Sequence, residues 1–203
     1  EVVAIVEGKR KPMGGHDHRW LRPGRNAPLQ KHLPRDKSLV DLAVAARIPI
    51  LQTVDINSPK AIGAIANVKP DLLVCVGFSH LFSQELLDSA AIGAINAHPS
   101  SLPQWRGPAP IFWQLKEGMK HLPVTVHWLY AKEDHGPILA RGSAQVFPRM
   151  SGDDIYQAGG ECAGRLLKPL LESMVSDIPE GEPQVGEPGP RARRPKPEDA
   201  TID

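Results

Sequence analysis

The stretch Asp71–Ala97, DLLVCVGFSHLFSQELLDSAAIGAINA, decides the fold because it places a short helix between two apolar runs. Asp71–Gly77 is apolar without interruption, as expected for a strand covered on both faces. Ser83–Asp88 is typical of a short helix, and Ala91–Ala97 of a second strand. A strand, a helix and a strand in this order predict an α/β fold with a mostly parallel sheet.

The same alternation continues on both sides of this stretch. Toward the N-terminus the sequence predicts a strand, a long loop, a helix, a strand and a helix, at Glu1–Glu7, Gly8–Lys37, Ser38–Arg47, Ile48–Gln52 and Ser58–Asn67. Toward the C-terminus it predicts a helix, an antiparallel strand pair and a last helix, at Ala109–Glu117, Leu122–Tyr130 with Ile138–Val146, and Asp153–Met174. The predicted class is a Rossmann-like open, mostly parallel sheet flanked by helices, with the antiparallel pair near the C-terminal end.

The composition is that of an ordinary globular protein of 203 residues, 41% of them apolar and 23% charged. No apolar stretch is long enough for a membrane span, and no secretory leader is visible. Cys75 and Cys162 have no metal or redox spacing, and Cys75 is expected to be a buried small hydrophobe. Together these features predict a cytoplasmic protein with no metal.

Charge is balanced overall, at +1, but basic residues gather near the N-terminus. Between Lys9 and Arg25 there are six Lys or Arg residues and one Asp. Such a cluster can bind phosphates, and it is equally compatible with a solvated surface loop. Residues 178–203 hold six prolines and few apolar side chains, so we expect a linker or tail after a folded domain at 1–177.

Candidate chemistry concentrates in Ile95–Leu139. Asn96 and His98 lie two residues apart at the end of a predicted strand, so their side chains point to the same side. The carboxyl ends of parallel strands are where open sheets bind ligands. Asp134 lies in a later loop beside Gly136, and a carboxylate next to a histidine raises its pKa and orients its ring. Taken singly, each residue also fits a structural role in a turn or a cap.

In combination these residues resemble a known pattern. The chain contains Asn96-x-His98-x-Ser100, Leu102-Pro103, Arg106-Gly107, Thr125-Val126-His127 and Asp134-x-Gly136-x-Ile138, in this order. This pattern is similar to that of the folate-dependent formyltransferases, the family of methionyl-tRNA, glycinamide ribonucleotide and amino-sugar N-formyltransferases. The likeness runs from Glu1 to about Met174, and Lys196–Asp203 resembles the linker that follows the N-terminal catalytic domain in the methionyl-tRNA and sugar branches.

The resemblance implies a catalytic domain at 1–177 that moves a formyl group from 10-formyltetrahydrofolate to an amine through a tetrahedral intermediate. Asn96 and a protonated His98 would stabilise the oxyanion. Asp134 would keep His98 cationic and, directly or through a water, accept the proton of the amine. The residues expected to contact the carrier are Ser79, His80, Leu81, Phe82, Ser100, Ser101, Leu102, Pro103, Ala131 and Lys132.

Several alternatives stay open at this point. The basic residues 9–25 favour an aminoacyl-tRNA acceptor such as methionyl-tRNA, whereas a glycinamide ribonucleotide or a nucleotide-linked amino sugar would fit the same catalytic residues. A formyltetrahydrofolate hydrolase or a non-catalytic folate-binding module is the alternative class. The chain also departs from the family pattern, because its first strand and helix would precede Glu1, and Leu122-Pro123 replaces a usual glycine. The sequence gives no prediction of the oligomeric state.

Overall fold

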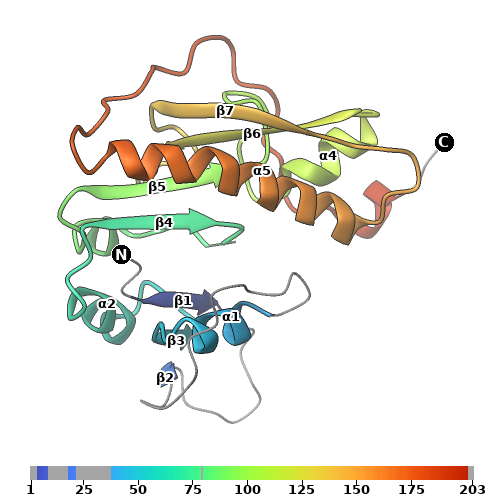
Figure 1. Ribbon diagram of the computed structural model, residues 1–203. Helices are drawn as coiled ribbons and strands as arrows, with labels where there is room; N and C mark the ends of the chain where they lie inside the picture. Colours follow the sequence, from blue (N-terminus) through green and yellow to red (C-terminus); the bar gives the residue numbers. More distant parts are fainter. Residues whose placement is uncertain (1–3, 9–17, 22–37, 79, 201–203) are drawn as a thin grey trace. The chain divides into compact units, whose positions relative to one another are not determined.

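The computed structural model of the protein describes residues 4–8, 18–21, 38–78 and 80–200. The chain divides into two compact units (Figure 1). Unit 1 consists of residues 1–71 and 82–92, and unit 2 of residues 72–81 and 93–203.

Unit 1 contains a three-stranded sheet in the order β1-β3-β2, with β1 at Ile5–Gly8, β2 at His18–Leu21 and β3 at Ile50–Thr53. β1 runs parallel to β3, and β2 runs antiparallel to it. Its helices are α1 (Leu39–Ala45), α2 (Pro59–Ala66) and α3 (Gln84–Leu87). A serine hydroxyl caps the start of each helix, at Ser38, Ser58 and Ser83.

One expectation for this unit is wrong. The stretch Gly8–Lys37 was expected to be a loop throughout, but His18–Leu21 forms β2. The pairing of His18 with Thr53 and of Leu21 with Ile50 shows the cause, since backbone bonds to β3 define this strand. A four-residue strand without alternating apolar residues leaves no periodic signal in the sequence. The rest of the basic cluster lies outside the described residues.

Unit 2 contains a four-stranded sheet in the order β4-β5-β6-β7. The strands are β4 (Leu72–Val76), β5 (Gly93–His98), β6 (His121–Trp128) and β7 (Ile138–Gln145). β4 and β5 are parallel, and the other two pairings are antiparallel. The α/β class and the antiparallel β6–β7 pair are therefore confirmed. Across the described strands the two sheets are mixed, because three of the five pairings are antiparallel.

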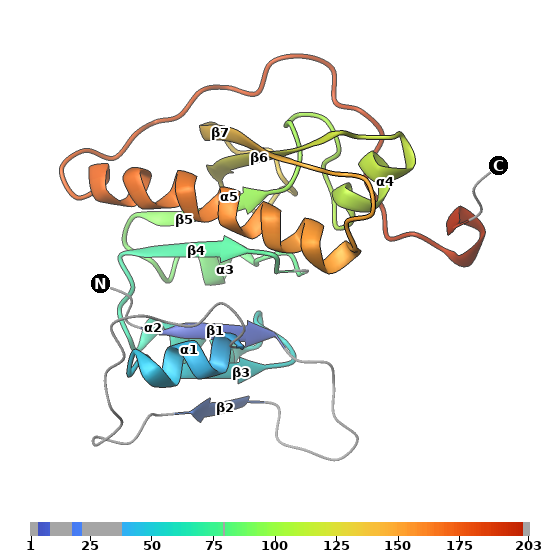
Figure 2. The same cartoon turned by 45° about the vertical axis from the view of Figure 1, so that its right-hand side comes forward.

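The helices of unit 2 are α4 (Pro110–Lys116), α5 (Gly152–Ser173) and a short 3₁₀ turn, η1, at Pro197–Ala200. α5 lies along one face of the sheet (Figure 2). It begins at a capping box between Ser151 and Asp154. Its apolar stripe packs with the inner side chains of the strands in one core, which includes Ile95, Leu122, Val124, Val126, Ile155, Cys162 and Leu167. This core fixes the positions of β5 and β6, the strands that carry the candidate site.

β4 differs from the expectation of a strand covered on both faces. Cys75 is buried, as predicted, and burial raises the pKa of its thiol to about 12. Its neighbours Val74 and Val76 are 44% and 50% exposed. Successive side chains of a strand point to opposite faces, so one face of β4 is covered and the other is open. An uninterrupted apolar run could not distinguish these two arrangements.

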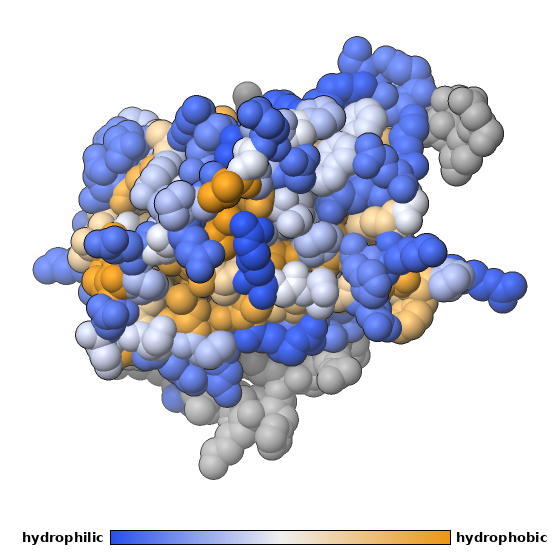
Figure 3. All heavy atoms as spheres, turned by 90° about the horizontal axis from the view of Figure 1, so that it is seen from above, coloured by the Kyte–Doolittle hydropathy of each residue, from blue (hydrophilic) through white to orange (hydrophobic). Residues whose placement is uncertain are grey.

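Residues after α5 return along unit 2 in an extended path (Figures 1 and 2). They are anchored to the folded part, since Glu182 exchanges two backbone hydrogen bonds with Ile138 and the side chain of Ala192 is fully buried. Seen from above, the protein presents mostly hydrophilic residues with hydrophobic ones between them (Figure 3). Among the described residues, no helix is long and apolar enough to cross a membrane.

Candidate active site

The pairing of β5 with β6 builds the first half of the site. In this antiparallel register Asn96 lies opposite His127, and His98 lies opposite Thr125. Residues two apart on a strand point to the same side, and directly opposite residues are neighbours across the pair. The register therefore gathers an amide, two imidazoles and a hydroxyl on one patch of the sheet. Of these, His98, Thr125 and His127 are buried.

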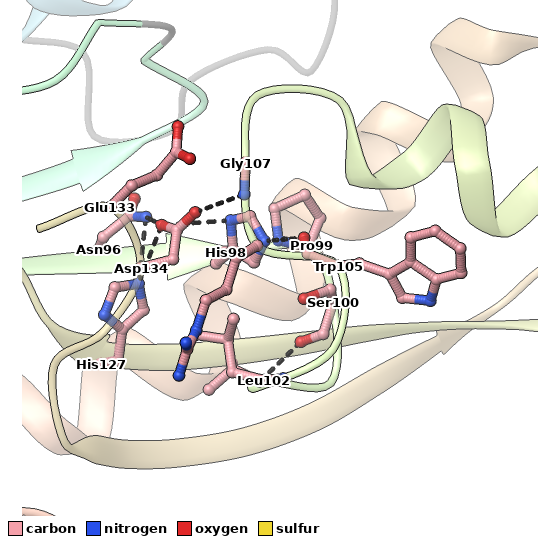
Figure 4. A network of polar contacts seen from close by, with 12 residues as sticks. Asn96, His98, Pro99, Ser100, Leu102, Trp105, Gly107, His127, Glu133 and Asp134 are labelled. Carbon is pink, nitrogen blue, oxygen red and sulfur yellow. Dashed lines mark hydrogen bonds and ion pairs between the residues drawn. The ribbon is translucent and has the colours of Figure 1, made fainter. Parts of the chain in front are cut away.

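Asp134, from the loop between β6 and β7, supplies the second half (Figure 4). Its Oδ1 lies 3.6 Å from His98 Nδ1, 3.6 Å from His127 Nε2 and 3.5 Å from Asn96 Nδ2. Its Oδ2 accepts a 2.9 Å hydrogen bond from the backbone N–H of Gly107. The three residues that the sequence predicts as catalytic thus lie within reach of one another around one carboxylate. Their catalytic roles stay a prediction.

Both loops of the site adopt strained backbone conformations. Asp134 has φ 50°, in the left-handed region that a short polar side chain tolerates. Trp105 has φ 59°, which is unusual for a bulky residue. Gly136 has no room for a side chain, because a Cβ there would lie 1.7 Å from the carbonyl oxygen of Trp128. Such strain persists only where surrounding contacts hold the chain in place.

The loop from Pro99 to Ala109 is held from inside. Thr125 Oγ1 donates to the Ser100 carbonyl at 2.6 Å, and Ser100 Oγ donates to the Gln104 carbonyl at 2.7 Å. His98 Nε2 lies 2.9 Å from the Trp105 carbonyl. A carbonyl only accepts, so His98 carries a hydrogen on Nε2 and turns Nδ1 toward Asp134. The loop contact thereby fixes which imidazole nitrogen faces the carboxylate.

Burial and charge act in opposite directions on the two central groups. Burial lowers the pKa of His98 below its ordinary 6.5, although the charge of Asp134 and the Trp105 carbonyl both raise it. Burial alone would raise the pKa of the Asp134 carboxyl. Hydrogen bonding from His127, the nearby charge of His98 and the Gly107 N–H outweigh burial and lower this pKa to about 2.

This balance corrects one expectation. The sequence suggests that proximity of Asp134 keeps His98 cationic, but the net direction of the His98 pKa is downward. The reason is that the imidazole is almost wholly enclosed, and burial penalises its charged form more than one carboxylate at 3.6 Å favours it. At neutral pH the site therefore holds a neutral His98 beside an ionised Asp134.

The residues predicted to contact the formyl carrier fall into three groups. Ser79 lies outside the described residues. Exposed side chains are those of His80, Leu81, Ser101, Ala131 and Lys132. Buried ones are those of Phe82, Ser100, Leu102 and Pro103. Ser100 is fully buried and its hydroxyl binds Gln104, so it shapes the loop from within. What these residues bind stays a prediction.

Sequence reasoning missed four groups that complete the site. His127 was noted only as part of the family pattern, and its place opposite Asn96 could have been found by pairing the two predicted strands. The Gly107 N–H, the Trp105 carbonyl and the side chain of Gln184 carry no signal, because backbone groups are common to all residues and Gln184 is distant in sequence. Within the described part of the chain, no group of three or more His, Cys, Asp or Glu residues could hold a metal ion.

Comparison with known proteins gives a consistent picture. The chain is 27% identical over 189 residues to the methionyl-tRNA formyltransferase of Acetivibrio thermocellus, covering 91% of this chain and 56% of that protein. It is 31% identical over 185 residues to the methionyl-tRNA formyltransferase of Pseudomonas fluorescens, covering 91% and 57%. The chain thus spans little more than half the length of these relatives. Their names alone do not transfer an acceptor to it.

Solved structures share the fold. The crystal structure of HypX from Aquifex aeolicus in complex with tetrahydrofolic acid matches with a TM-score of 0.64 and 18% identity, covering 80% of this chain and 28% of that one. At this identity the likeness concerns the fold alone. The family described as formyl transferase matches residues 1–169. With a match over most of its length, the chain belongs to the formyl transferase family.

Proposed function

We propose that this chain transfers a formyl group from 10-formyltetrahydrofolate to the amine of an acceptor, with a methionyl-tRNA as the preferred acceptor. The observation that carries the proposal is that Asn96 and His98 both lie next to the carboxylate of Asp134. Family membership supports formyl transfer as the reaction. The tetrahydrofolic acid bound to the HypX structure supports a folate as the formyl carrier.

Asn96 is suited to stabilise the oxygen that becomes negative when the amine attacks the formyl carbon. Its amide N–H groups are on Nδ2, which points toward the centre of the site, 3.3 Å from His127 and 3.5 Å from Asp134. Both contacts are long for hydrogen bonds, so a better acceptor can replace them. Removing one oxyanion donor typically costs about 10²–10³ in rate.

The His98–Asp134 pair is suited to take the proton that the amine loses. A carboxyl with a pKa of about 2 is a weak base by itself. A neutral His98 offers the Nδ1 lone pair, and Asp134 at 3.6 Å stabilises the cation that forms when this nitrogen is protonated. In this division of labour His98 is the proton acceptor and Asp134 its electrostatic support. No covalent intermediate with the protein is needed.

The proposed acceptor follows from the relatives and from the charge of the N-terminal segment. Both compared relatives are named methionyl-tRNA formyltransferases. The basic residues between Lys9 and Arg25 offer positive charge for phosphates. Binding through phosphates weakens steeply as salt concentration rises, whereas a small uncharged amine would show little salt dependence. We therefore expect affinity for methionyl-tRNA to fall strongly between low and moderate salt.

The test supplies 10-formyltetrahydrofolate with methionyl-tRNA, glycinamide ribonucleotide and a nucleotide-linked amino sugar in separate reactions. Free tetrahydrofolate and formylated acceptor are both measured. We expect coupled formation of both products with methionyl-tRNA. The variant Asn96→Ala should reduce kcat by about 10²–10³ through loss of one oxyanion donor.

Each other outcome points elsewhere. Coupled turnover with another amine would keep formyl transfer and change the acceptor. Formate release at the same rate without any acceptor would replace the proposal with a hydrolase. If the folded protein, checked by circular dichroism, gives neither product, the catalytic proposal is wrong for this chain.

A further inference from the structure

The segment that follows α5 binds both loops that carry the site. Next to the Asp134 loop, Glu182 and Ile138, the first residue of β7, exchange backbone hydrogen bonds of 2.7 Å. Further along the segment, Ala192 N–H donates to the Arg106 carbonyl at 2.7 Å, and its carbonyl accepts from Ala109 N–H at 2.9 Å. Backbone bonds of this kind fix the path of the segment. The segment therefore passes from one site loop to the other.

Gln184 lies between these two contacts and bonds to both loops through its side chain. Its Nε2 donates to the carbonyl of Asp134 at 2.8 Å and to the carbonyl of Gly136 at 2.9 Å. Its Oε1 accepts from Arg106 Nε at 3.2 Å and Arg106 Nη2 at 2.6 Å. A primary amide has two donor hydrogens and two acceptor lone pairs. All four are used here, which requires an amide at this position.

Arg106 is itself fixed from the other loop. Its Nη1 lies 2.7 Å from His135 Nε2, and His135 Nδ1 binds the carbonyl of Glu133. An imidazole that donates from Nδ1 to a carbonyl leaves Nε2 free to accept, which suits the guanidinium. Arg106, Gln184 and His135 thus form one connected network behind the Asp134 loop.

This network links the same two loops as the hydrogen bond between Gly107 and the Asp134 carboxylate. Gly107, the residue after Arg106, donates its N–H to Asp134 Oδ2 at 2.9 Å. The two loops are therefore joined through the Asp134 carboxylate, through the contact of Arg106 with His135, and through Gln184 on the backbone of Asp134. Because Asp134 has φ 50°, its backbone needs outside contacts to hold it.

We propose that Gln184 is a positioning residue that holds the Asp134 carboxylate against His98 and Gly107. The proposal rests on the proposed function for the meaning of its effect on turnover. Gln184 does not touch the reacting groups; it acts on them through the Asp134 backbone. The Pro-rich segment is, in this view, a working part of the site.

Other contacts of the segment are less suited to this role. Arg191 forms a bidentate ion pair with Glu133 at 2.6 and 2.8 Å, but its side chain is 57% exposed. Exposed ion pairs contribute little, because water and salt screen them. Gln104 Nε2 donates to the Glu187 carbonyl at an exposed position. Of these contacts, only those of Gln184 reach the backbone of Asp134 itself.

Two variants separate positioning from simple attachment of the segment. Gln184→Met keeps the length of the side chain and removes all four hydrogen bonds. Gln184→Glu can still accept from Arg106, but it cannot donate to the carbonyls of Asp134 and Gly136. The matched control is Val185→Ser, which changes the next residue, whose side chain is 82% exposed.

If Gln184 positions Asp134, both Gln184 variants should lower kcat by about tenfold to a hundredfold. A displacement of a catalytic group by about 1 Å can reduce the rate a hundredfold. KM should change by less than about threefold, because an interaction needed only in the transition state acts on kcat. Hydrogen exchange of the Gly107 amide, which reports its bond to Asp134 without any turnover, should become faster in both. Val185→Ser should match the wild type in all three measurements.

The outcomes distinguish this inference from the proposed function. Wild-type turnover combined with unchanged kcat and unchanged Gly107 exchange in Gln184→Met would overturn the positioning role alone. A defect in Gln184→Met but not in Gln184→Glu would also overturn it, because attachment to Arg106 would then suffice. If the wild type transfers no formyl group, the proposed function fails, and Gly107 exchange alone still decides whether Gln184 holds Asp134.

Discussion

The two halves of the site are built in different ways. Asn96, His98 and His127 project from paired strands, and the β5–β6 register alone makes them neighbours. Asp134 and Gly107 lie in loops with positive φ angles and are held by contacts from several parts of unit 2. The strand-borne half depends on the core, whereas the loop-borne half depends on individual hydrogen bonds. Substitutions in the two halves should therefore differ in their effects on stability and on the rate of formyl transfer.

The largest effect is expected for Asp134→Asn, which keeps the shape of the side chain and removes its charge. Without the carboxylate, protonation of His98 Nδ1 loses its electrostatic support. The rate of formyl transfer should fall by about 10²–10⁴, the usual range for a group in acid–base catalysis. Single-turnover assays with 10-formyltetrahydrofolate measure it directly.

If Asp134→Asn transfers the formyl group at a rate within about fivefold of the wild-type rate, the loss is well below the usual acid–base contribution. That result would contradict a catalytic role for Asp134. Circular dichroism and an unfolding curve in urea serve as the control, since they show whether the variant is folded.

The second effect concerns stability at Gly136. An added Cβ would lie 1.7 Å from the Trp128 carbonyl oxygen, so Gly136→Ala must displace the Asp134 loop or the end of β6. The free energy of unfolding should fall by about 1–3 kcal/mol, as for other overpacked positions. Urea unfolding followed by fluorescence measures this change.

Gly164→Ala is the matched control for this substitution. Gly164 lies in α5, where an added Cβ would meet nothing within 4 Å beyond the backbone of its own helix, and alanine is the better helix former by about 1 kcal/mol. Gly136→Ala should thus destabilise where Gly164→Ala does not. Equal stability of the two variants would show that the Asp134 loop yields without resistance.

A smaller effect is expected on the pH dependence of stability. Because the folded pKa of His98 is below its unfolded value of 6.5, the unfolded chain binds more protons just below pH 6.5. Stability should therefore decline as the pH falls below 6.5. In His98→Gln this part of the decline should disappear, and urea midpoints at pH 7.5 and 5.5 in both proteins measure the difference.

Asp134 acts in a separate, more acidic window. Its pKa of about 2 is below its ordinary 3.8, so its stabilisation is present above pH 3.8 and is lost as the pH falls toward 2. This lowering of the Asp134 pKa corresponds to about 2 kcal/mol of stability.

The test of His98 has a clear negative outcome. If the stability of the wild type and of His98→Gln declines equally between pH 7.5 and 5.5, the lowered His98 pKa is contradicted.

Sequence patterns predicted the parts of the fold that depend on local or periodic signals. The helices predicted at Ser38–Arg47, Ser58–Asn67 and Asp153–Met174 are present, each with a serine cap at its start, and such a cap is a local signal because its side chain binds backbone only three residues away. The β6–β7 pair was predicted because its strands are close in sequence. β2 was missed, and so was the open face of β4, since both depend on what lies beside a strand.

For the site, the sequence by itself determined which chemical groups are present: Asn96, His98 and Asp134 in a spacing that resembles the formyltransferase pattern. Only the tertiary structure decided that burial makes His98 neutral, that His127 and the Gly107 N–H share the carboxylate, and that Gln184 supports it from 50 residues away. The physical reason is that residue identity fixes the available charges and donors. Their protonation and partners depend on burial and distance, which arise only when remote segments pack together.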